Sequence, residues 1–326
     1  MSTGHPKKTR LIADIGGTHT RIAVVYPPCT EPLAQWSFVT ADFHDLVTPL
    51  RVALNEWSGS YPDEAICAVA SPLLTDQVSL TNVGWSFSIS ETQAALGLEK
   101  LELVNDWVAQ ALAIPHLNAN QCQALYAGAL VTDAPRLVMG PGTGLGSAAL
   151  IPWNQQWQAL ACEGGHMSFA PTTHRESEIV AHIHHQYGHC SAERVASGIG
   201  IATVYASICA LDGIEPISDS PEVISTAAAD GNPQATETFD LFNAALGSVA
   251  GDLALALGAR GGVYLGGGLI PALGSLFDPA RFYARFIAKG RFERYLAEIP
   301  IWQVLPTDAA LIGLAAKPLP NGLSDR

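Results

Sequence analysis

A chain of 326 residues is too long for one ordinary hydrophobic core, so two domains or two lobes are expected. Hydrophobic residues make up 48% of the chain, which is typical of a globular protein and excludes a disordered one. The formal net charge of −13 argues against nucleic acid as a partner, because an acidic surface repels phosphate backbones. An anionic substrate must then be held locally, by backbone amides or a metal ion.

The cysteines and the apolar stretches indicate a cytoplasmic protein. The six cysteines are scattered and none forms a CxxC pair, which favours a reducing compartment. The polar segment 1–10 lacks the apolar stretch of a signal peptide. Asp252 interrupts the best apolar run, residues 244–259, so neither a membrane-spanning segment nor a membrane partner is expected.

The first elements predicted are two strands, residues 11–15 and 21–26, joined by a glycine turn. A helix capped by Asp42 is expected next, with apolar residues at positions Phe43, Leu46, Val47, Leu50 and Leu54. A buried strand over 65–70 follows, and then a helix opened by a Ser90/Gln93 capping box. A strand over 101–104 and a helix stopped by Pro115 complete this part of the chain. Sheets covered by helices define the α/β class.

The strand–turn–strand pattern then returns over residues 137–151, and residues 15–25 align with residues 140–150. One module therefore serves twice. The later elements expected are helices over 175–187, 201–211, 221–229 and 239–257, the last a core helix, strands over 262–265 and 301–305, and a closing helix after Asp308. We expect a small α/β lobe of residues 1–115, on which a C-terminal helix of residues 306–326 packs back, and a large α/β lobe of residues 116–305.

Three glycine-rich loops are the first feature of the sequence that indicates a binding function. Gly16, Gly17 and Thr18 follow a strand that ends near Asp14, and Gly142, Thr143 and Gly144 follow another strand. Glycine lets backbone N–H groups approach an anion, and a carboxylate such as Asp14 can hold Mg²⁺ through water. The second loop leads into a strand, which argues against a dinucleotide fingerprint and favours a phosphate-binding hairpin. Hairpin turns that merely need glycine are the structural alternative.

The third loop, Gly266, Gly267 and Gly268, follows a strand and opens a helix. It suits the flat approach of an adenine ring or ribose, or it simply eases the packing of the strand on the helix.

Polar side chains supply the second signal. Asp106 follows a buried strand and suits a general base toward a hydroxyl, although Asn105 and Asp106 are also good helix caps. Glu163, His166 and Glu193 add acceptors and donors for the hydroxyls of a small polyol.

A histidine cluster at His182, His184, His185 and His189 is interpreted as a solvated helix face rather than a metal site. His185 and His189 are four residues apart, but the segment has no cysteine-rich partner for closed zinc coordination.

Six short motifs thus follow in order, at residues 14–18, 103–106, 142–146, 163–166, 188–198 and 266–268. In order and spacing they resemble the bacterial glucokinases, from residue 11 to about residue 315. The resemblance implies the actin-like ATPase (ribonuclease H-like) fold, with two lobes and a central cleft for sugar and ATP. It further implies transfer of a phosphoryl group from ATP to the 6-hydroxyl of glucose, with Mg²⁺, in a homodimer.

The resemblance also implies a role for each motif. Asp106 would be the base, and Asn105, Glu163, His166 and Glu193 would bind sugar hydroxyls. The loops at 16–18 and 142–144 would hold phosphates, and residues 266–268 the adenosine.

Two residues depart from the family pattern. Ser168 stands where an acidic residue is expected, and His19 is an unusual neighbour of the first loop. The alternatives are a kinase for another hexose or a broad hexokinase, a non-catalytic sugar sensor, and an actin-like filament protein. The start of the fold at Leu11, with no room for a preceding DNA-binding module, and the presence of Asp106 argue against the sensor. The polar sugar-binding set argues against the filament protein.

Overall fold

The computed structural model describes residues 8–71, 73–80 and 83–318. The chain forms two compact units, one within Met1–Asn118 and Asp308–Arg326 and the other within Ala119–Thr307. The divisions thus fall at 118/119 and 307/308, where the sequence suggested 115/116 and 305/306.

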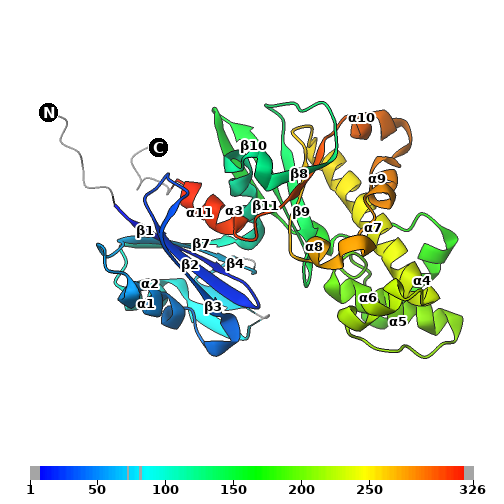
Figure 1. Ribbon diagram of the computed structural model, residues 1–326, viewed down its shortest axis with the longest axis horizontal. Helices are drawn as coiled ribbons and strands as arrows, with labels where there is room; N and C mark the ends of the chain where they lie inside the picture. The colour runs from blue at the N-terminus through cyan, green and yellow to red at the C-terminus, as the bar shows by residue number, and fades with distance from the viewer. Residues whose placement is uncertain (1–7, 72, 81–82, 319–326) are drawn as a thin grey trace. The chain divides into compact units, whose positions relative to one another are not determined.

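The first unit is built on a five-stranded sheet in the order β3-β2-β1-β4-β7 (Figure 1). Its strands are β1 (Arg10–Ile15), β2 (His19–Val25), β3 (Pro32–Val39), β4 (Glu64–Val69) and β7 (Lys100–Asn105). Strand β2 pairs antiparallel with β1 and β3, whereas β1, β4 and β7 run parallel. A separate hairpin joins β5 (Gln77–Leu80) to β6 (Trp85–Ser88).

Helices α1 (Val47–Glu56) and α2 (Ile89–Leu96) lie on one side of this sheet, and α3 (Asp106–Ala113) and α11 (Ala309–Ala316) lie on the other (Figure 1). Residues Leu11, Ala13 and Ile15 alternate along β1 and join the core that contains α1. Helix α11 packs tightly on α3. Glycine at position 313 permits this close approach, because any side chain there would collide with the carbonyl oxygen of Ala109.

The second unit repeats the same strand arrangement. Its sheet has the order β11-β10-β9-β12-β13-β8. Strand β10 pairs antiparallel with β9 and β11, whereas β9, β12 and β13 run parallel. The strands are β8 (Cys122–Tyr126), β9 (Arg136–Pro141), β10 (Leu145–Trp153), β11 (Gln156–Cys162), β12 (Val263–Leu265) and β13 (Ile301–Val304). The repeat predicted from two strands therefore extends to five, with β8 added at one edge.

The remaining helices of the second unit are α4 (His174–Tyr187), α5 (Gly198–Asp212), α6 (Pro221–Ala229), α7 (Pro233–Leu257), α8 (Leu269–Leu273), α9 (Pro279–Ile287) and α10 (Glu293–Ala297). At 25 residues, α7 is long and apolar enough to cross a membrane, which the apolar-run analysis did not anticipate. Its most apolar 18-residue window is 72% buried, as in the core helix that was expected. Gly247 lets it approach the backbone of Phe282 on α9.

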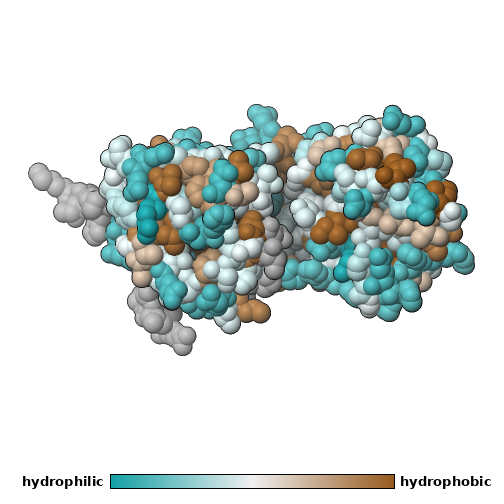
Figure 2. All heavy atoms as spheres, turned by 90° about the horizontal axis from the view of Figure 1, so that it is seen from below, coloured by the Kyte–Doolittle hydropathy of each residue, from teal (hydrophilic) through white to brown (hydrophobic). Residues whose placement is uncertain are grey.

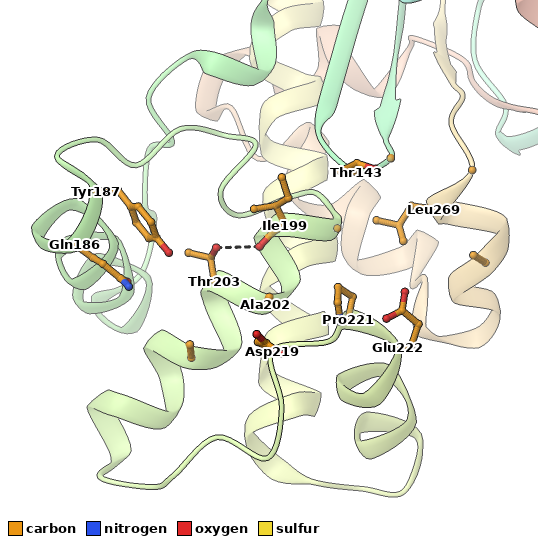
Figure 3. A pocket seen from close by; sticks show the side chains of 15 residues that line it. Thr143, Gln186, Tyr187, Ile199, Ala202, Thr203, Asp219, Pro221, Glu222 and Leu269 are labelled. Atoms are coloured by element: carbon orange, nitrogen blue, oxygen red, sulfur yellow. Dashed lines mark hydrogen bonds between the residues drawn. The ribbon is translucent and has the colours of Figure 1, made fainter. Parts of the chain in front are cut away.

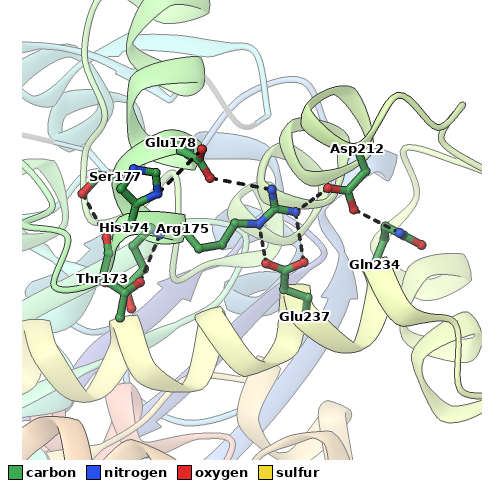
Figure 4. A network of polar contacts seen from close by, with 9 residues as sticks. Thr173, His174, Arg175, Ser177, Glu178, Asp212, Gln234 and Glu237 are labelled. Carbon is green, nitrogen blue, oxygen red and sulfur yellow. Dashed lines mark hydrogen bonds and ion pairs between the residues drawn. The ribbon is translucent and has the colours of Figure 1, made fainter.

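An arginine joins three helices of this unit (Figure 4). Arg175 on α4 donates through Nε to Glu237 of α7 at 2.8 Å and through Nη2 to Asp212 of α5 at 2.7 Å. The hydrogen bond to Glu237 is the main reason that the pKa of Arg175 lies above its ordinary value. Gln234 extends the network by donating to Asp212 at 3.1 Å.

Two predicted helix starts are wrong. The helix expected from Asp42 begins at Val47, because residues Thr40–Asp42 form a 3₁₀ turn and Asp45 accepts from the backbone N–H of Thr48 at 2.7 Å. The second cap lies at Ser88, whose hydroxyl accepts from the N–H of Glu91 at 3.1 Å. The same Ser-x-x-Glu/Gln pattern therefore occurs two residues before the Ser90/Gln93 pair.

The α-helix α3 ends at Ala113, within one residue of the end predicted before Pro115. Pro115 itself lies inside a 3₁₀ turn, Ile114–His116, that continues from α3. A proline early in a turn loses only an N–H that has no intrahelical partner.

On the face drawn in Figure 2, hydrophobic residues lie in small patches among hydrophilic ones. Isolated exposed apolar residues such as Trp153 are normal for a globular protein.

Candidate active site

The first glycine loop lies in the first unit, between β1 and β2. Gly16 donates its N–H to the carbonyl of His19 at 3.0 Å, which closes the turn. Buried Thr40 fixes it from the side, because its hydroxyl donates to Gly16 O at 2.8 Å and its N–H donates to Thr18 O at 2.9 Å. Gly17 and Thr18 are exposed at the tip. Thr40 was not predicted, because a threonine directly after the third strand has no sequence pattern that links it to this loop.

Asp14 is a largely buried carboxylate beside this loop. Its side chain is 15% exposed, and Arg21, opposite it in the β1–β2 register, places Nη1 3.6 Å from Oδ2. Burial raises the pKa of Asp14 to about 6, and Arg21 opposes that shift. An oxygen ligand at a strand end fits a Mg²⁺ ion that keeps most of its waters and binds substrate phosphates, although one carboxylate alone would not select the metal.

Asn105 and Asp106 occupy the end of β7 and the first residue of α3. The side-chain oxygen of Asn105 accepts from the N–H of Trp107 at 2.9 Å and of Val108 at 3.3 Å, so Asn105 caps the helix. Its amide nitrogen can still donate to a ligand. Asp106 Oδ1 accepts from Trp107 N–H at 2.9 Å, which orients the carboxylate.

In the second unit, the two remaining glycine loops lie against each other. Gly266 donates its N–H to Met139 O at 2.9 Å, and a side chain at Gly140 would collide with the carbonyl of Gly266. Gly267 has φ of +87° and lies over Pro141, where a Cβ would be 2.5 Å from the carbonyl oxygen. Glycine is therefore required on both strands for this contact.

Helix α5 begins at the second loop. The N–H groups of Gly198 and Ile199 donate to the carbonyls of Gly142 and Thr143 at 2.9 and 3.2 Å. The loop is thus held by the first amides of α5, which begins after the cap Ser197.

A cavity of about 790 Å³ opens where the loops and helices meet (Figure 3). Its lining comes from both glycine loops and from α4, α5, α6 and α8: Gly142, Thr143, Gln186, Tyr187, Gly198, Ile199, Ala202, Thr203, Ala206, Asp219, Pro221, Glu222, Gly268, Leu269 and Ala272. The described residues of this lining include two carboxylates and no lysine or arginine. A phosphorylated ligand would therefore depend on backbone amides, Thr143 and a counterion.

Of this lining, the sequence predicted Gly142, Thr143 and Gly268 as nucleotide ligands. The other walls come from α4, α5, α6 and α8, and apart from Gly198 no short motif marks them.

The polar segment at 163–166 lies beside the segment that carries Glu193. Glu193 donates its N–H to Gly165 O at 2.8 Å, and Ala192 donates to Met167 O at 2.8 Å. Glu163 and His166 are exposed, and Glu193 is half-buried. These three predicted ligands thus come together within the second unit, whereas Asn105 and Asp106 belong to the first. Ser168 forms a backbone bridge to Ser191.

The histidine cluster lies on α4 and just after it. His189 lies 3.2 Å, through Nε2, from the carbonyl of His166, and His184 and His185 are exposed. Within the described part of the chain, no three His, Cys, Asp or Glu side chains converge as metal ligands.

The repeated sheet and its paired glycine loops define a class, the sugar kinases of the actin-like ATPase fold. The family model for glucokinase matches residues 11–319. A glucokinase from Paramagnetospirillum magneticum is 42% identical over 308 residues, which cover 94% of this chain and 96% of that protein. The chain belongs to the glucokinase family, so the predicted family and enzyme class, an ATP-dependent glucose kinase, are confirmed.

Solved structures agree with this assignment. The crystal structure of a glucokinase from an Antarctic psychrotroph matches with a TM-score of 0.83 and 37% identity, over 95% of this chain and 98% of that one. A ROK family glucokinase from Streptomyces griseus, in complex with glucose and AMPPNP, matches with a TM-score of 0.62 and 20% identity, over 94% and 98%. The second likeness supports the fold alone, and the α/β, actin-like part of the predicted fold is confirmed.

Proposed function

We propose that the chain transfers the γ-phosphoryl group of ATP to the 6-hydroxyl of glucose, giving glucose 6-phosphate and ADP. The observation that carries this proposal is the cavity lined by two glycine loops, in the same unit as two adjacent segments that bear Glu163, His166 and Glu193. Phosphoryl transfer needs little covalent chemistry from a protein, because positioning and charge stabilisation supply most of the rate.

The nucleotide would occupy the cavity of the second unit. Gly268 of the third loop lines the cavity, and residues 266–268 would receive the adenosine. Gly142 and Thr143 of the second loop line it too, and residues 142–144 would hold phosphates through the backbone and the threonine hydroxyl. Gly16, Gly17 and Thr18 of the first unit would also hold phosphates. Mg²⁺ bound through water to Asp14 would offset the phosphate charge, because the described lining of the cavity has no lysine or arginine.

The sugar would be bound by both units. Asn105 donates through its amide, and Glu163, His166 and Glu193 bind the other hydroxyls. Asp106 accepts the proton of the 6-hydroxyl as the oxygen attacks the γ-phosphorus, and it is the proposed catalytic residue. Binding to both units would form a central cleft between two lobes.

The cellular setting extends this proposal. Six cysteines are free in the described residues, which suits a reducing cytoplasm. We propose a homodimer, as the resemblance to bacterial glucokinases implies, with glucose, ATP and Mg²⁺ as its ligands.

Another hexose is the second candidate substrate, because Ser168 departs from the family pattern beside the sugar segment. A coupled assay of ADP release with glucose, mannose, fructose, galactose and N-acetylglucosamine tests the choice. We expect the highest kcat/KM with glucose, with the product phosphorylated at the 6-position. A higher kcat/KM for any other sugar would reassign the substrate.

A further inference from the structure

Glu193 contacts the end of the second glycine loop as well as the polar segment at residues 163–166. Its carboxylate oxygen Oε2 accepts a hydrogen bond from the N–H of Leu145 at 3.0 Å. Leu145 directly follows the loop Gly142-Thr143-Gly144, two residues of which line the cavity. A side chain proposed as a sugar ligand therefore holds the end of a phosphate loop.

The absence of a side chain at Gly144 makes this contact possible. A Cβ at Gly144 would collide with Oε2 of Glu193 and would lie 3.1 Å from its Cδ. The loop and the carboxylate are thus in direct contact, and the glycine serves the approach of Glu193 in addition to the approach of a phosphate.

The backbone of Glu193 connects the segment 163–166 to the start of α5, which contacts the loop in turn. Its N–H donates to Gly165 O of the sugar segment at 2.8 Å. Its carbonyl accepts from the hydroxyl of Ser197 at 2.7 Å, and Ser197 caps α5. The first amides of α5 in turn donate to the loop carbonyls of Gly142 and Thr143. Backbone and side chain therefore fix Glu193 between the sugar segment and the nucleotide loop.

We propose that Glu193 is a positioning residue for the nucleotide loop, in addition to the sugar contact proposed above. One carboxylate oxygen, Oε2, accepts from Leu145 and holds the loop in the shape that receives the phosphates. The other oxygen, Oε1, would bind a sugar hydroxyl. This inference rests on the proposed function, because it assigns the cavity to the nucleotide. A sugar bound to Glu193 would thereby be linked to the phosphate loop through this one side chain.

The hydrogen bond requires an acceptor at the Glu193 position but no negative charge. Glu193→Gln keeps an amide oxygen of the same reach, so the loop stays in place. Glu193→Ala leaves the Leu145 N–H without this acceptor, and Glu193→Asp shortens the side chain by one methylene group. Either change frees the loop, and the nucleotide must then order it on binding.

The test is calorimetric titration with AMPPNP and Mg²⁺ in the absence of any sugar, so that sugar binding does not contribute. We expect the affinity to fall about tenfold in Glu193→Ala and Glu193→Asp and to stay within about threefold of the unsubstituted protein in Glu193→Gln. Glu163→Gln is the matched control, a neighbouring carboxylate whose loss should weaken glucose binding and leave sugar-free nucleotide affinity in place. Thermal unfolding checks the fold of each variant, and Glu193→Asp gives the result if the alanine variant is unfolded.

Equal affinity in the aspartate variant and the unsubstituted protein would overturn the positioning role. So would a glutamine variant as weak as the aspartate variant, since the charge and not the hydrogen bond would then act. If the unsubstituted protein itself fails to bind AMPPNP, the proposed function falls, and the inference falls with it.

Discussion

At the scale of single residues, Asp14, the proposed Mg²⁺ ligand, is a carboxylate whose burial lowers the stability of the folded chain at neutral pH. It is a buried carboxylate whose main electrostatic partner is one arginine at 3.6 Å. Its pKa of about 6 in the folded chain exceeds the ordinary value near 4, so the folded state binds the extra proton between these pH values. The free energy of unfolding therefore falls as pH rises from about 4 to about 6 and stays lower above that.

Asp14→Asn should remove this loss of stability. We expect the variant to be more stable than the unsubstituted protein by about 2 kcal/mol at pH 8, with the difference disappearing near pH 4. Urea unfolding at both pH values measures it. A stability difference that is the same at pH 4 and pH 8 would show that Asp14 does not titrate in this range.

Several residues of the site were predictable because their chemistry is local. Asp14 and Gly16 at one turn, and Gly142 and Gly144 at another, show in the sequence as glycines directly after an apolar strand. Thr40 and the bond from Leu145 to Glu193 were not predictable, because they join positions 24 and 48 residues apart. Such contacts are fixed by strand register and loop packing rather than by local pattern.

At the scale of secondary-structure elements, periodicity predicted α4, α6 and the strands β1, β4 and β12 to within about two residues, whereas the closing helix α11 is shorter than the predicted 306–326. It missed β3, β8 and β11, whose residues are mostly exposed or half-buried and so lack an apolar run. Helix α9 was missed too, although Phe282 and Phe286 are fully buried against α7.

Helix α5 forms one wall of the proposed nucleotide cavity, which gives a direct test of that assignment. Ala206 is exposed and lines the cavity, so Ala206→Trp should fill it without disturbing the core. We expect KM for ATP to rise by about tenfold or more while KM for glucose changes less than about twofold. Steady-state kinetics with each substrate varied separately measures both.

The matched control lies one turn further along α5. Ala210 is also exposed but does not line the cavity, so Ala210→Trp should leave both constants near their original values. An Ala206→Trp enzyme with an unchanged KM for ATP would place the nucleotide elsewhere.

The Arg175 network should stabilise the packing of α4, α5 and α7. Arg175→Ala removes hydrogen bonds to two carboxylates on two helices, and we expect a loss of about 1 kcal/mol, because the side chain is 35% exposed and the network is partly screened. Arg294→Ala is the control, since Arg294 is 94% exposed and its pair with Glu298 spans 3.7 Å. Denaturant midpoints of the two variants give the comparison, and equal midpoints would mean that the network contributes nothing measurable.

At the scale of the whole molecule, the repeated five-strand sheet accounts for two similar glycine loops in one chain, both proposed to hold phosphates. Each unit places a glycine turn between two adjacent antiparallel strands, at residues 16–18 between β1 and β2 and at residues 142–144 between β9 and β10. The sequence revealed only the hairpin part of this repeat, because the parallel strands β4 and β12 have no sequence similarity that marks them as equivalent.

The proposed sugar ligands come from both units, so glucose should draw the units together before the chemical step. A ligand that binds both favours the closed state by the affinity gained there. Closure around the sugar also keeps water, a competing nucleophile, away from ATP. Small-angle scattering should show a smaller radius of gyration at saturating glucose, at constant oligomeric state. An unchanged scattering curve, with binding verified by calorimetry, would mean that the site is preformed.

The central claim is that the chain phosphorylates glucose with Asp106 as the base, and the kcat of Asp106→Asn tests it most directly. Asparagine keeps the shape of the side chain and its acceptor oxygen toward Trp107, but it cannot take the proton. The exposed Asp133→Asn serves as the control for the same substitution elsewhere. The account predicts a fall in kcat of about 10²- to 10⁴-fold, with glucose binding still measurable by calorimetry. A variant that keeps more than about a tenth of the original kcat would contradict it.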